Sequence, residues 1–206
     1  MIEAEPDVAA SLFGDRIGLA REYARELGER GEELGLIGPL EAGRLWSRHL
    51  LNCVLPAPLL RPGLVGDIGS GAGMPGIVLA IARPDVDFVL VEPMARRVDW
   101  LRAESSRLGL DNVRVERARA EDAPLIERLD QVTARAVASL TKLIPITAPL
   151  ARRGGELLFM KGARVADEVV AAAKQIRSAR LSAVEVLVLG EGIVPEVTRV
   201  FRATVD

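Results

Sequence analysis

The 206-residue chain has one cysteine, one histidine and no long uncharged apolar run. Cys53 can form neither an intramolecular disulfide nor a cysteine-based zinc cluster, so it is expected to be a small buried apolar residue in a reducing compartment. The acidic N-terminus lacks the features of a signal peptide, and no stretch reaches about 18 uncharged apolar residues. These absences predict a cytoplasmic protein that neither is secreted nor spans a membrane.

Net charge is also small, but it is unevenly distributed. The whole chain carries −2, whereas residues 1–45 hold ten acidic residues against five arginines, which leaves about +3 for the remainder. Any nucleic-acid surface is therefore expected on the later region and not on the N-terminal helix. The length suffices for one main core without disulfides or metals.

Two helical segments are predicted near the N-terminus. Apolar residues recur at three- or four-residue steps over residues 9–34, and Gly35 marks the end of this segment. A second helix is expected over residues 40–54, before a proline-rich stretch that removes backbone donors. Residues 1–60 are therefore interpreted as a helical extension packed on a core domain at 61–206.

Seven short apolar runs are predicted to be strands, most of them separated by helical stretches. The runs span 64–68, 88–91, 113–115, 131–134, 156–160, 184–189 and 198–201. This alternation predicts an α/β, Rossmann-like, mostly parallel sheet covered by helices. Gly190, Gly192 and Pro195 indicate a returning loop between the last two runs, so the last strand is expected to be antiparallel.

A glycine-rich turn, V-G-D-I-G-S-G-A-G-M-P-G over residues 65–76, follows the first predicted strand. Gly69, Gly71 and Gly73 allow a tight turn and the close approach of a ligand to the backbone. Pro75 is suited to begin the helix that follows. A cofactor loop is the interpretation that fits this strand, turn and helix.

The same turn contains G-x-G-x-x-G, so a dinucleotide site of the NAD type is the main alternative. Asp67 argues against it, because a carboxylate there repels a pyrophosphate but suits the cationic amino-acid part of S-adenosylmethionine (SAM). Glu92 ends the second predicted strand, where a carboxylate can accept hydrogen bonds from two ribose hydroxyls. Ala120 and Glu121 follow the third strand, where contacts to adenine are expected.

The chemistry of the group that would accept the methyl of SAM is inferred from catalytic groups that the chain lacks. The chain has no N/D-P-P-Y/F tetrapeptide, and both Cys53 and His49 precede the α/β core, so neither a cytosine C5 nucleophile nor an obvious imidazole base is present. The acceptor should therefore need no activation. Guanine N7 has a free lone pair and fits this requirement, with alignment as the main catalytic contribution.

Four segments in order carry a family resemblance: G-D-I-G-S-G-A-G-M-P-G, V-E-P-M-A-R-R-V-D-W-L-R, T-A-R-A-V-A-S-L and L-F-M-K-G. Together they resemble the RsmG/GidB family of bacterial 16S rRNA guanine-N7 methyltransferases over roughly residues 40–170, and R-H-L-L-N at 48–52 resembles that family's R-H-(I/L)-x-(D/N). The resemblance implies a class I SAM-methyltransferase fold. It also implies methylation of a guanine in the 530-loop region of 16S rRNA, with SAM and no metal. Separately, the enzyme is expected to be a monomer.

The resemblance also implies residue roles. Gly69 and Met74 would contact SAM from the first loop, Ala120 and Glu121 from the loop after the third strand, and Arg135 after the fourth. Arg135 and Lys161 are the candidates for contacts with the substrate, either with its phosphate groups or with the target guanine. A solvated loop lysine is an equal alternative for Lys161.

Some features remain open between structural and functional roles. His49 is as well explained by a core or capping position as by an RNA contact. The stretch at 36–41 lacks the N-L-T-like sequence typical of many members, which makes RNA contacts there doubtful. Trp46, Trp100 and Phe159 are candidates to stack on a flipped base, although each residue type is more often core. A small-molecule methyltransferase and a non-catalytic SAM sensor are the remaining alternatives to the rRNA enzyme.

Overall fold

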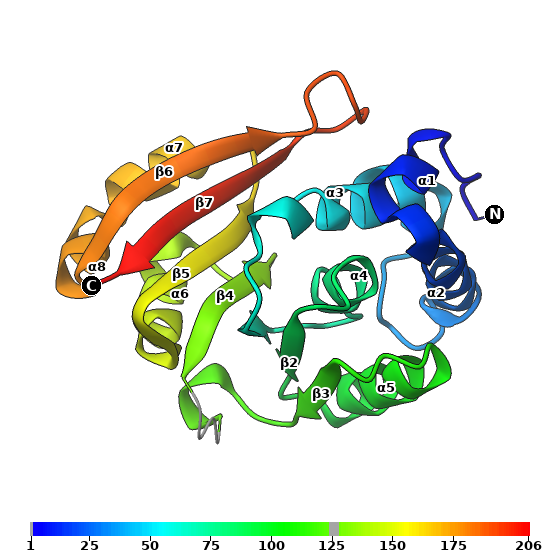
Figure 1. The fold of residues 1–206 in the computed structure, drawn as a ribbon, viewed down its shortest axis with the longest axis horizontal. Helices are drawn as coiled ribbons and strands as arrows, with labels where there is room; N and C mark the ends of the chain where they lie inside the picture. Colours follow the sequence, from blue (N-terminus) through cyan, green and yellow to red (C-terminus); the bar gives the residue numbers. More distant parts are fainter. Residues whose placement is uncertain (1, 124–127) are drawn as a thin grey trace.

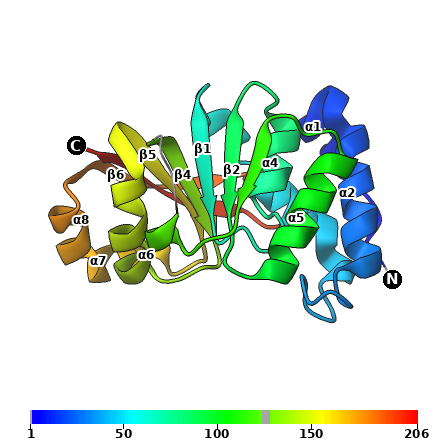
Figure 2. The same cartoon turned by 90° about the horizontal axis from the view of Figure 1, so that it is seen from below.

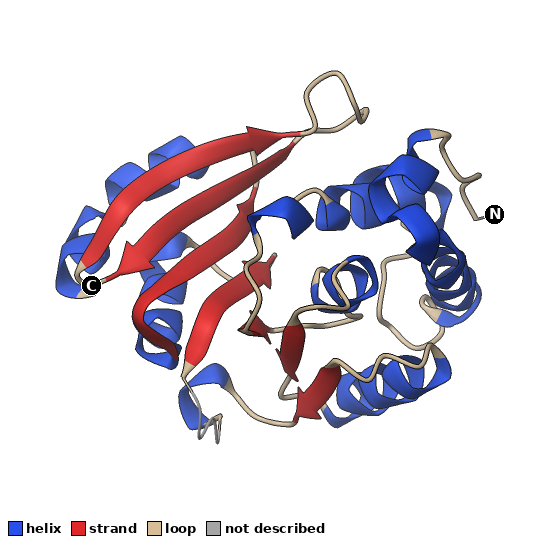
Figure 3. Ribbon diagram, viewed as in Figure 1, coloured by secondary structure: helices blue, strands red, loops and turns tan. Residues whose placement is uncertain are grey.

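The computed structural model describes residues 2–123 and 128–206, and their strands form one seven-stranded sheet (Figures 1 and 3). The strands are β1 (Leu64–Ile68), β2 (Asp87–Val91), β3 (Val113–Glu116), β4 (Leu129–Arg135), β5 (Ala151–Lys161), β6 (Leu181–Leu189) and β7 (Thr198–Val205). Their order is β3-β2-β1-β4-β5-β7-β6, and β7 runs antiparallel to the other six strands. The prediction of a mostly parallel sheet with an antiparallel last strand is confirmed.

Helices cover both faces of this sheet. They are α1 (Val8–Phe13), α2 (Ile17–Arg30), α3 (Leu51–Val54), α4 (Gly76–Ala82), α5 (Ala95–Arg107), α6 (Leu140–Thr147), α7 (Val165–Ala171) and α8 (Ala173–Ser178). Figure 2 shows α1, α2 and α5 at one end of the molecule and α6 to α8 at the other. Of the helices in the described residues, none is long and apolar enough to cross a membrane.

Alternate strand residues enter two separate hydrophobic cores. Phe88 and Leu90 of β2 belong to the core that contains α4, whereas Val89 and Val91 belong to the core that contains α6. This is the two-residue period of a strand buried on both faces. The first core also includes Tyr23 of α2, so the N-terminal helices pack directly on the same side of the sheet as α4.

The N-terminal helices differ from the continuous segments expected. The segment predicted as one helix over 9–34 is broken at Gly14, whose φ of +53° is a left-handed value that does not continue an α-helix, and α2 ends at Arg30. The segment predicted over 40–54 begins at Ala42 with a 3-10 turn and passes through a π-helical stretch at Leu45–Leu50. The wide π turn lies where this segment reaches the site described below.

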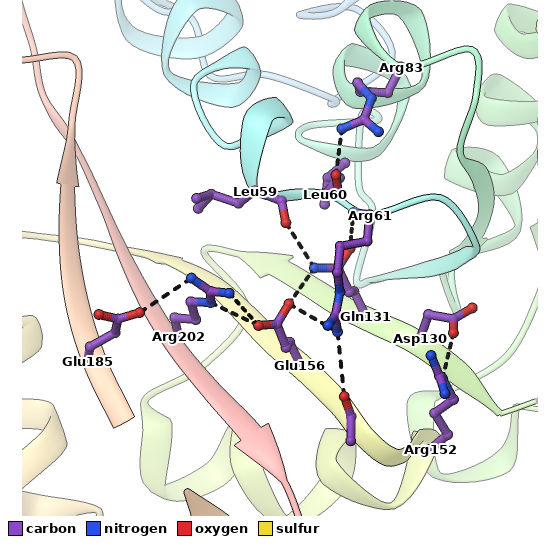
Figure 4. Close-up of polar contacts among 11 residues, drawn as sticks. Leu59, Leu60, Arg61, Arg83, Asp130, Gln131, Arg152, Glu156, Glu185 and Arg202 are labelled. Atoms are coloured by element: carbon purple, nitrogen blue, oxygen red, sulfur yellow. Dashed lines mark hydrogen bonds and ion pairs between the residues drawn. The ribbon is translucent and has the colours of Figure 1, made fainter. Parts of the chain in front are cut away.

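A buried polar cluster fixes the linker before β1 (Figure 4). The side-chain oxygen of Gln131 accepts a hydrogen bond from the Arg61 amide at 2.8 Å, and its nitrogen donates to the Leu59 carbonyl at 3.0 Å. The same nitrogen donates to Glu156 Oε2 at 2.8 Å, while Arg202 of β7 binds Glu156 Oε1 at 2.6 and 3.0 Å. These bonds join the linker to β4, β5 and β7, and so they set where the helical extension enters the sheet.

Candidate active site

The glycine-rich turn connects β1 to α4 at the carboxyl edge of the sheet. Gly69, Gly71 and Gly73 have φ values of +70°, +58° and +104°, which side chains other than glycine rarely adopt. A Cβ at Gly69 would lie 2.8 Å from Val137 Cγ2, whereas a Cβ at Gly71 would make only an ordinary contact, with the Gly69 carbonyl oxygen at 3.8 Å. The backbone at Gly71 is therefore open to a ligand.

Two side chains from different elements hold this turn at Ala72. Tyr23 Oη of α2 and Trp100 Nε1 of α5 each donate a hydrogen bond of 2.8 Å to the Ala72 carbonyl. Burial raises the pKa of Tyr23 well above its usual value, so its hydroxyl keeps the proton that it donates. Trp100 is thereby part of the core and supports the turn instead of offering a surface for a base.

Removing both hydrogen-bond donors to the Ala72 carbonyl is expected to lower the free energy of unfolding by more than the sum of the two single losses. Tyr23→Phe alone should lower the free energy of unfolding by about 0.5–1.5 kcal/mol, because Trp100 still satisfies the carbonyl. The variant that combines Tyr23→Phe with Trp100→Phe leaves a buried carbonyl without a partner. Urea unfolding of the four proteins in a double-mutant cycle measures the coupling, and strictly additive free energies would contradict a shared role.

Asp67 lies fully buried beneath the turn. Its Oδ2 accepts a hydrogen bond from the Gly76 amide at 3.0 Å, while its Oδ1 is buried without a partner among the described residues. Burial raises the pKa of Asp67 to about 7, against the opposing influence of the Ser70 hydroxyl and the Gly76 amide. An acceptor without a partner at this position suits a cationic or hydrogen-donating ligand group.

Glu92 ties the turn to the start of α5. Its Oε2 accepts from the Gly71 amide and its Oε1 from the Met94 amide, both at 3.0 Å, and the side chain is almost completely buried. Arg97 Nη1 lies 3.9 Å from Oε2. A carboxylate oxygen can accept more than one hydrogen bond, so these contacts leave acceptor capacity for a ligand.

A cavity of about 300 Å³ opens between this turn and the helical extension. It is lined by Leu36, Ile37, Gly38, Glu41, His49, Gly69, Ser70, Gly71, Ala72, Met74, Arg97, Arg135 and Ala136. Ala120 is buried in the α6 core and Glu121 is exposed, so the structure does not bring either into this lining. Of the ten predicted site residues, four meet in this cavity: Gly69, Gly71, Met74 and Arg135.

A second cavity of about 720 Å³ adjoins the first at Arg135 and Ala136, which line both. Its lining is Arg48, Asn52, Arg135, Ala136, Met160, Lys161, Gly162, Ala163, Glu168, Pro195, Glu196, Val197, Thr198 and Arg199. Ala136 has a φ of +57°, a conformation that costs a non-glycine residue about 1–3 kcal/mol and often marks functional sites. A further cavity of about 690 Å³ lies at the opposite edge, beside α6 and α8, and includes none of the predicted residues.

Arg135 ends β4 and is held by the helical extension. Its guanidinium donates to His49 Nδ1 at 2.8 Å, to the Arg48 carbonyl at 3.3 Å and to Cys53 Sγ at 3.4 Å. The sequence alone placed His49 and Cys53 outside the core domain, although R-H-L-L-N was a signal that this segment matters. Chain folding brings both against Arg135, with Cys53 fully buried as expected.

Lys161 lines the second cavity, but its charge is already paired. Its Nζ lies 2.7 Å from Glu168 Oε2 and donates to the Ala138 carbonyl at 2.7 Å, and only 10% of the side chain is exposed. Lys161 therefore holds the loop after β4 in place. Trp46 and Phe159, considered as stacking surfaces, are both buried in the core.

Comparison with known proteins identifies the family. The profile of the family described as rRNA small subunit methyltransferase G matches residues 16–196. Proteins named ribosomal RNA small subunit methyltransferase G from Clavibacter sepedonicus and Leifsonia xyli subsp. xyli are 65% and 62% identical, each over 99% of this chain and 97% and 98% of their own length. The chain belongs to this family. Membership identifies a methyltransferase and excludes the NAD oxidoreductase.

Solved structures agree with the fold at low sequence identity. A SAM-dependent methyltransferase from Aquifex aeolicus superposes with a TM-score of 0.59 and 17% identity, over 85% of this chain and 98% of that one. A precorrin-6y C5,15-methyltransferase from Geobacter metallireducens gives 0.56 and 17%, over 76% and 88%. The predicted class I SAM-methyltransferase fold is therefore confirmed.

Proposed function

We propose that this protein transfers a methyl group from SAM to N7 of a guanine in the 530-loop region of 16S rRNA. The observation that carries the proposal is the pair of cavities that meet at Arg135, one on the glycine-rich turn and one open to a larger substrate. The names of the relatives support rRNA of the small subunit as the substrate. The enzyme is proposed to act as a monomer in the cytoplasm.

Residues of the glycine-rich turn, together with the two carboxylates buried beside it, suit SAM. Asp67 Oδ1 is a buried acceptor without a partner among the described residues, suited to the cationic amino-acid group, and Gly71 lines the first cavity. Glu92 would hold the ribose, with Gly69 and Met74 as further contacts. When bound, SAM supplies an electrophilic methyl group that suits a nucleophile with a free lone pair.

The second cavity offers no evident free base among the described residues. Its carboxylates are engaged, because Glu168 pairs with Lys161 and Glu196 lies 3.5 Å from Arg48. An acceptor that needs no deprotonation suits such a cavity, and guanine N7 is one. Arg135 is proposed to orient the base or an adjacent phosphate, but not by a bidentate bond to O6 and N7, since N7 must stay free. Lys161 is proposed to act on the substrate indirectly, through the loop that it holds.

The contacts of Ala120 and Glu121 with SAM remain a proposal, as does the division of the chain at residue 60. Ala120 begins the turn after β3, at the carboxyl edge that also carries Glu92. Residues 1–60 are proposed to be an extension of the domain at 61–206 and not an independent domain, because Tyr23 and His49 complete the site.

Methyl transfer from radiolabelled SAM to 30S particles and to free 16S rRNA, both from cells that lack the modification, tests the function. One labelled guanine that becomes sensitive to borohydride and aniline cleavage is the expected result, because this cleavage reports 7-methylguanine. A matched RNA with 7-deazaguanine at the mapped position should accept no methyl group. Transfer to the 7-deaza RNA, or SAM binding without any transfer, would overturn the proposal.

A further inference from the structure

A chain of three side chains runs from the helical extension to the junction of the two cavities. Glu41 Oε2 lies 2.5 Å from His49 Nε2, and His49 Nδ1 lies 2.8 Å from an Arg135 guanidinium nitrogen. His49 is only 8% exposed. All three residues line the first cavity, and Arg135 also lines the second.

The two partners of His49 determine which ring nitrogen carries the proton. A guanidinium has only donors, so Nδ1 of His49 must accept the hydrogen bond from Arg135. The proton of the neutral ring then lies on Nε2 and is donated to the Glu41 carboxylate. One neutral tautomer alone satisfies both contacts.

A second proton on His49 is incompatible with this arrangement. It would place an N–H on Nδ1, directly facing an Arg135 N–H, and would bring two positive charges together. The other contacts of Arg135, to the Arg48 carbonyl and Cys53 Sγ, are longer at 3.3 and 3.4 Å. Protonation therefore removes the shortest bond that holds the guanidinium.

Burial and two neighbouring arginines favour the neutral ring of His49. Burial lowers the pKa of His49 below its usual 6.5, and the charges of Arg135 and Arg48 act in the same direction, opposed by Glu41. Arg48 in turn lies near Glu41 at 3.8 Å and Glu196 at 3.5 Å. The neutral ring is thus favoured at pH 7 and above, and lowering the pH shifts His49 toward the charged form.

We propose that neutral His49 is a positioning residue that holds Arg135 at the junction of the two cavities and releases it on protonation. The inference rests on the proposed function, since it assigns to His49 control over a residue of the transfer site. It requires no proton transfer to or from the substrate. His49 acts through Arg135, so methyl transfer should depend on the protonation of a group that does not itself react.

Two substitutions of His49 separate its two bonds. In His49→Asn the side-chain oxygen can take the place of Nδ1 as acceptor for Arg135, but it does not titrate. In His49→Gln the amide nitrogen can take the place of Nε2 beside Glu41, and the acceptor for Arg135 is lost. The rate of transfer at saturating SAM is measured for each from pH 5 to 8.5, which removes effects of pH on SAM binding.

The wild-type rate is expected to fall about tenfold per pH unit below the pKa of His49. His49→Asn should lack this acid limb, and His49→Gln should be slower than His49→Asn at pH 8 by about 10- to 100-fold, from lost alignment. An acid limb that persists in His49→Asn, or equal rates for the two variants, would overturn the proposal.

Nuclear magnetic resonance tests the arrangement independently of methyl transfer. Because the chain has one histidine, the imidazole ¹⁵N signals belong to His49 alone. They should report the Nε2–H tautomer at pH 8, and Arg135→Ala should raise the pKa of His49 because a neighbouring positive charge is lost. An Nδ1–H tautomer would refute the inference even if transfer occurs, whereas absent transfer with the expected tautomer would refute only the proposed function.

Discussion

Arg135→Ala is expected to lower the rate of methyl transfer to rRNA by about 100- to 1000-fold at saturating SAM. Among the described residues, Arg135 is the one charged residue that lines both the first and the second cavity, so its removal affects alignment of the substrate more than binding of the cofactor. The affinity for SAM should weaken by less than about tenfold, in line with the loss of one hydrogen-bonding side chain. Single-turnover transfer and isothermal titration of SAM measure the two effects separately.

Two further variants make the Arg135 result specific. Arg135→Lys keeps the positive charge but not the planar set of donors that reaches His49, Arg48 and Cys53, so its rate should lie between those of the wild type and Arg135→Ala. Arg114→Ala removes an exposed arginine from β3 that lines neither cavity, and it serves as the control. A rate for Arg135→Ala within threefold of the Arg114→Ala rate would contradict the proposed role.

Asp67→Asn is expected to weaken SAM binding by about 100-fold and to remove its dependence on pH near 7. The carboxylate must be charged to attract a cationic ligand, and its raised pKa of about 7 means that it is half protonated at neutral pH in the free protein. Wild-type affinity should therefore increase as the pH rises from 6 to 8. Titration calorimetry over this range checks the expectation, with Asp87→Asn, an exposed carboxylate at the start of β2, as the control.

The same buried carboxylate should make the free protein less stable at higher pH. The pKa is about 7 in the folded protein against 3.8 for an ordinary aspartate, so the folded state binds more protons between these values and stability falls as the pH rises through 7. Each pH unit corresponds to about 1.4 kcal/mol, an upper bound for this group. Asp67→Asn should remove this decline and raise Tm by several degrees at pH 8. A variant that binds SAM normally, or is less stable than wild type at pH 8, would contradict this account.

The sheet and its glycine-rich turn could be predicted because local sequence encodes both. Strands buried on two faces appear as short apolar runs, and Phe88 to Val91 is one of them. Gly69, Gly71 and Gly73 are required by backbone angles that other residues rarely adopt. The position of β7 between β5 and β6 could not be predicted in the same way. The hairpin signal predicts antiparallel pairing of the last two strands, but not which edge of the sheet the hairpin joins.

The partners of the predicted site residues were not predictable. The sequence is equally compatible with Lys161 as a substrate contact and as a solvated lysine. Only the fold brings it to Glu168 and the Ala138 carbonyl. Glu92 was predicted for a ribose, but the sequence does not show that the Gly71 and Met94 amides also bind it. A side chain's neighbours depend on packing between distant segments, which no local pattern specifies.

The sequence by itself determined the α/β order of elements, the cofactor turn and, through its motifs, the family. Only the tertiary structure decided that Glu41 and His49, which lie in the extension before the core domain, meet Arg135 at the end of β4, 86 residues beyond His49. The physical reason is the range of the interactions involved. Backbone angles and strand periodicity act within a few residues, whereas a buried imidazole acquires its tautomer and its pKa from charges that folding brings to it.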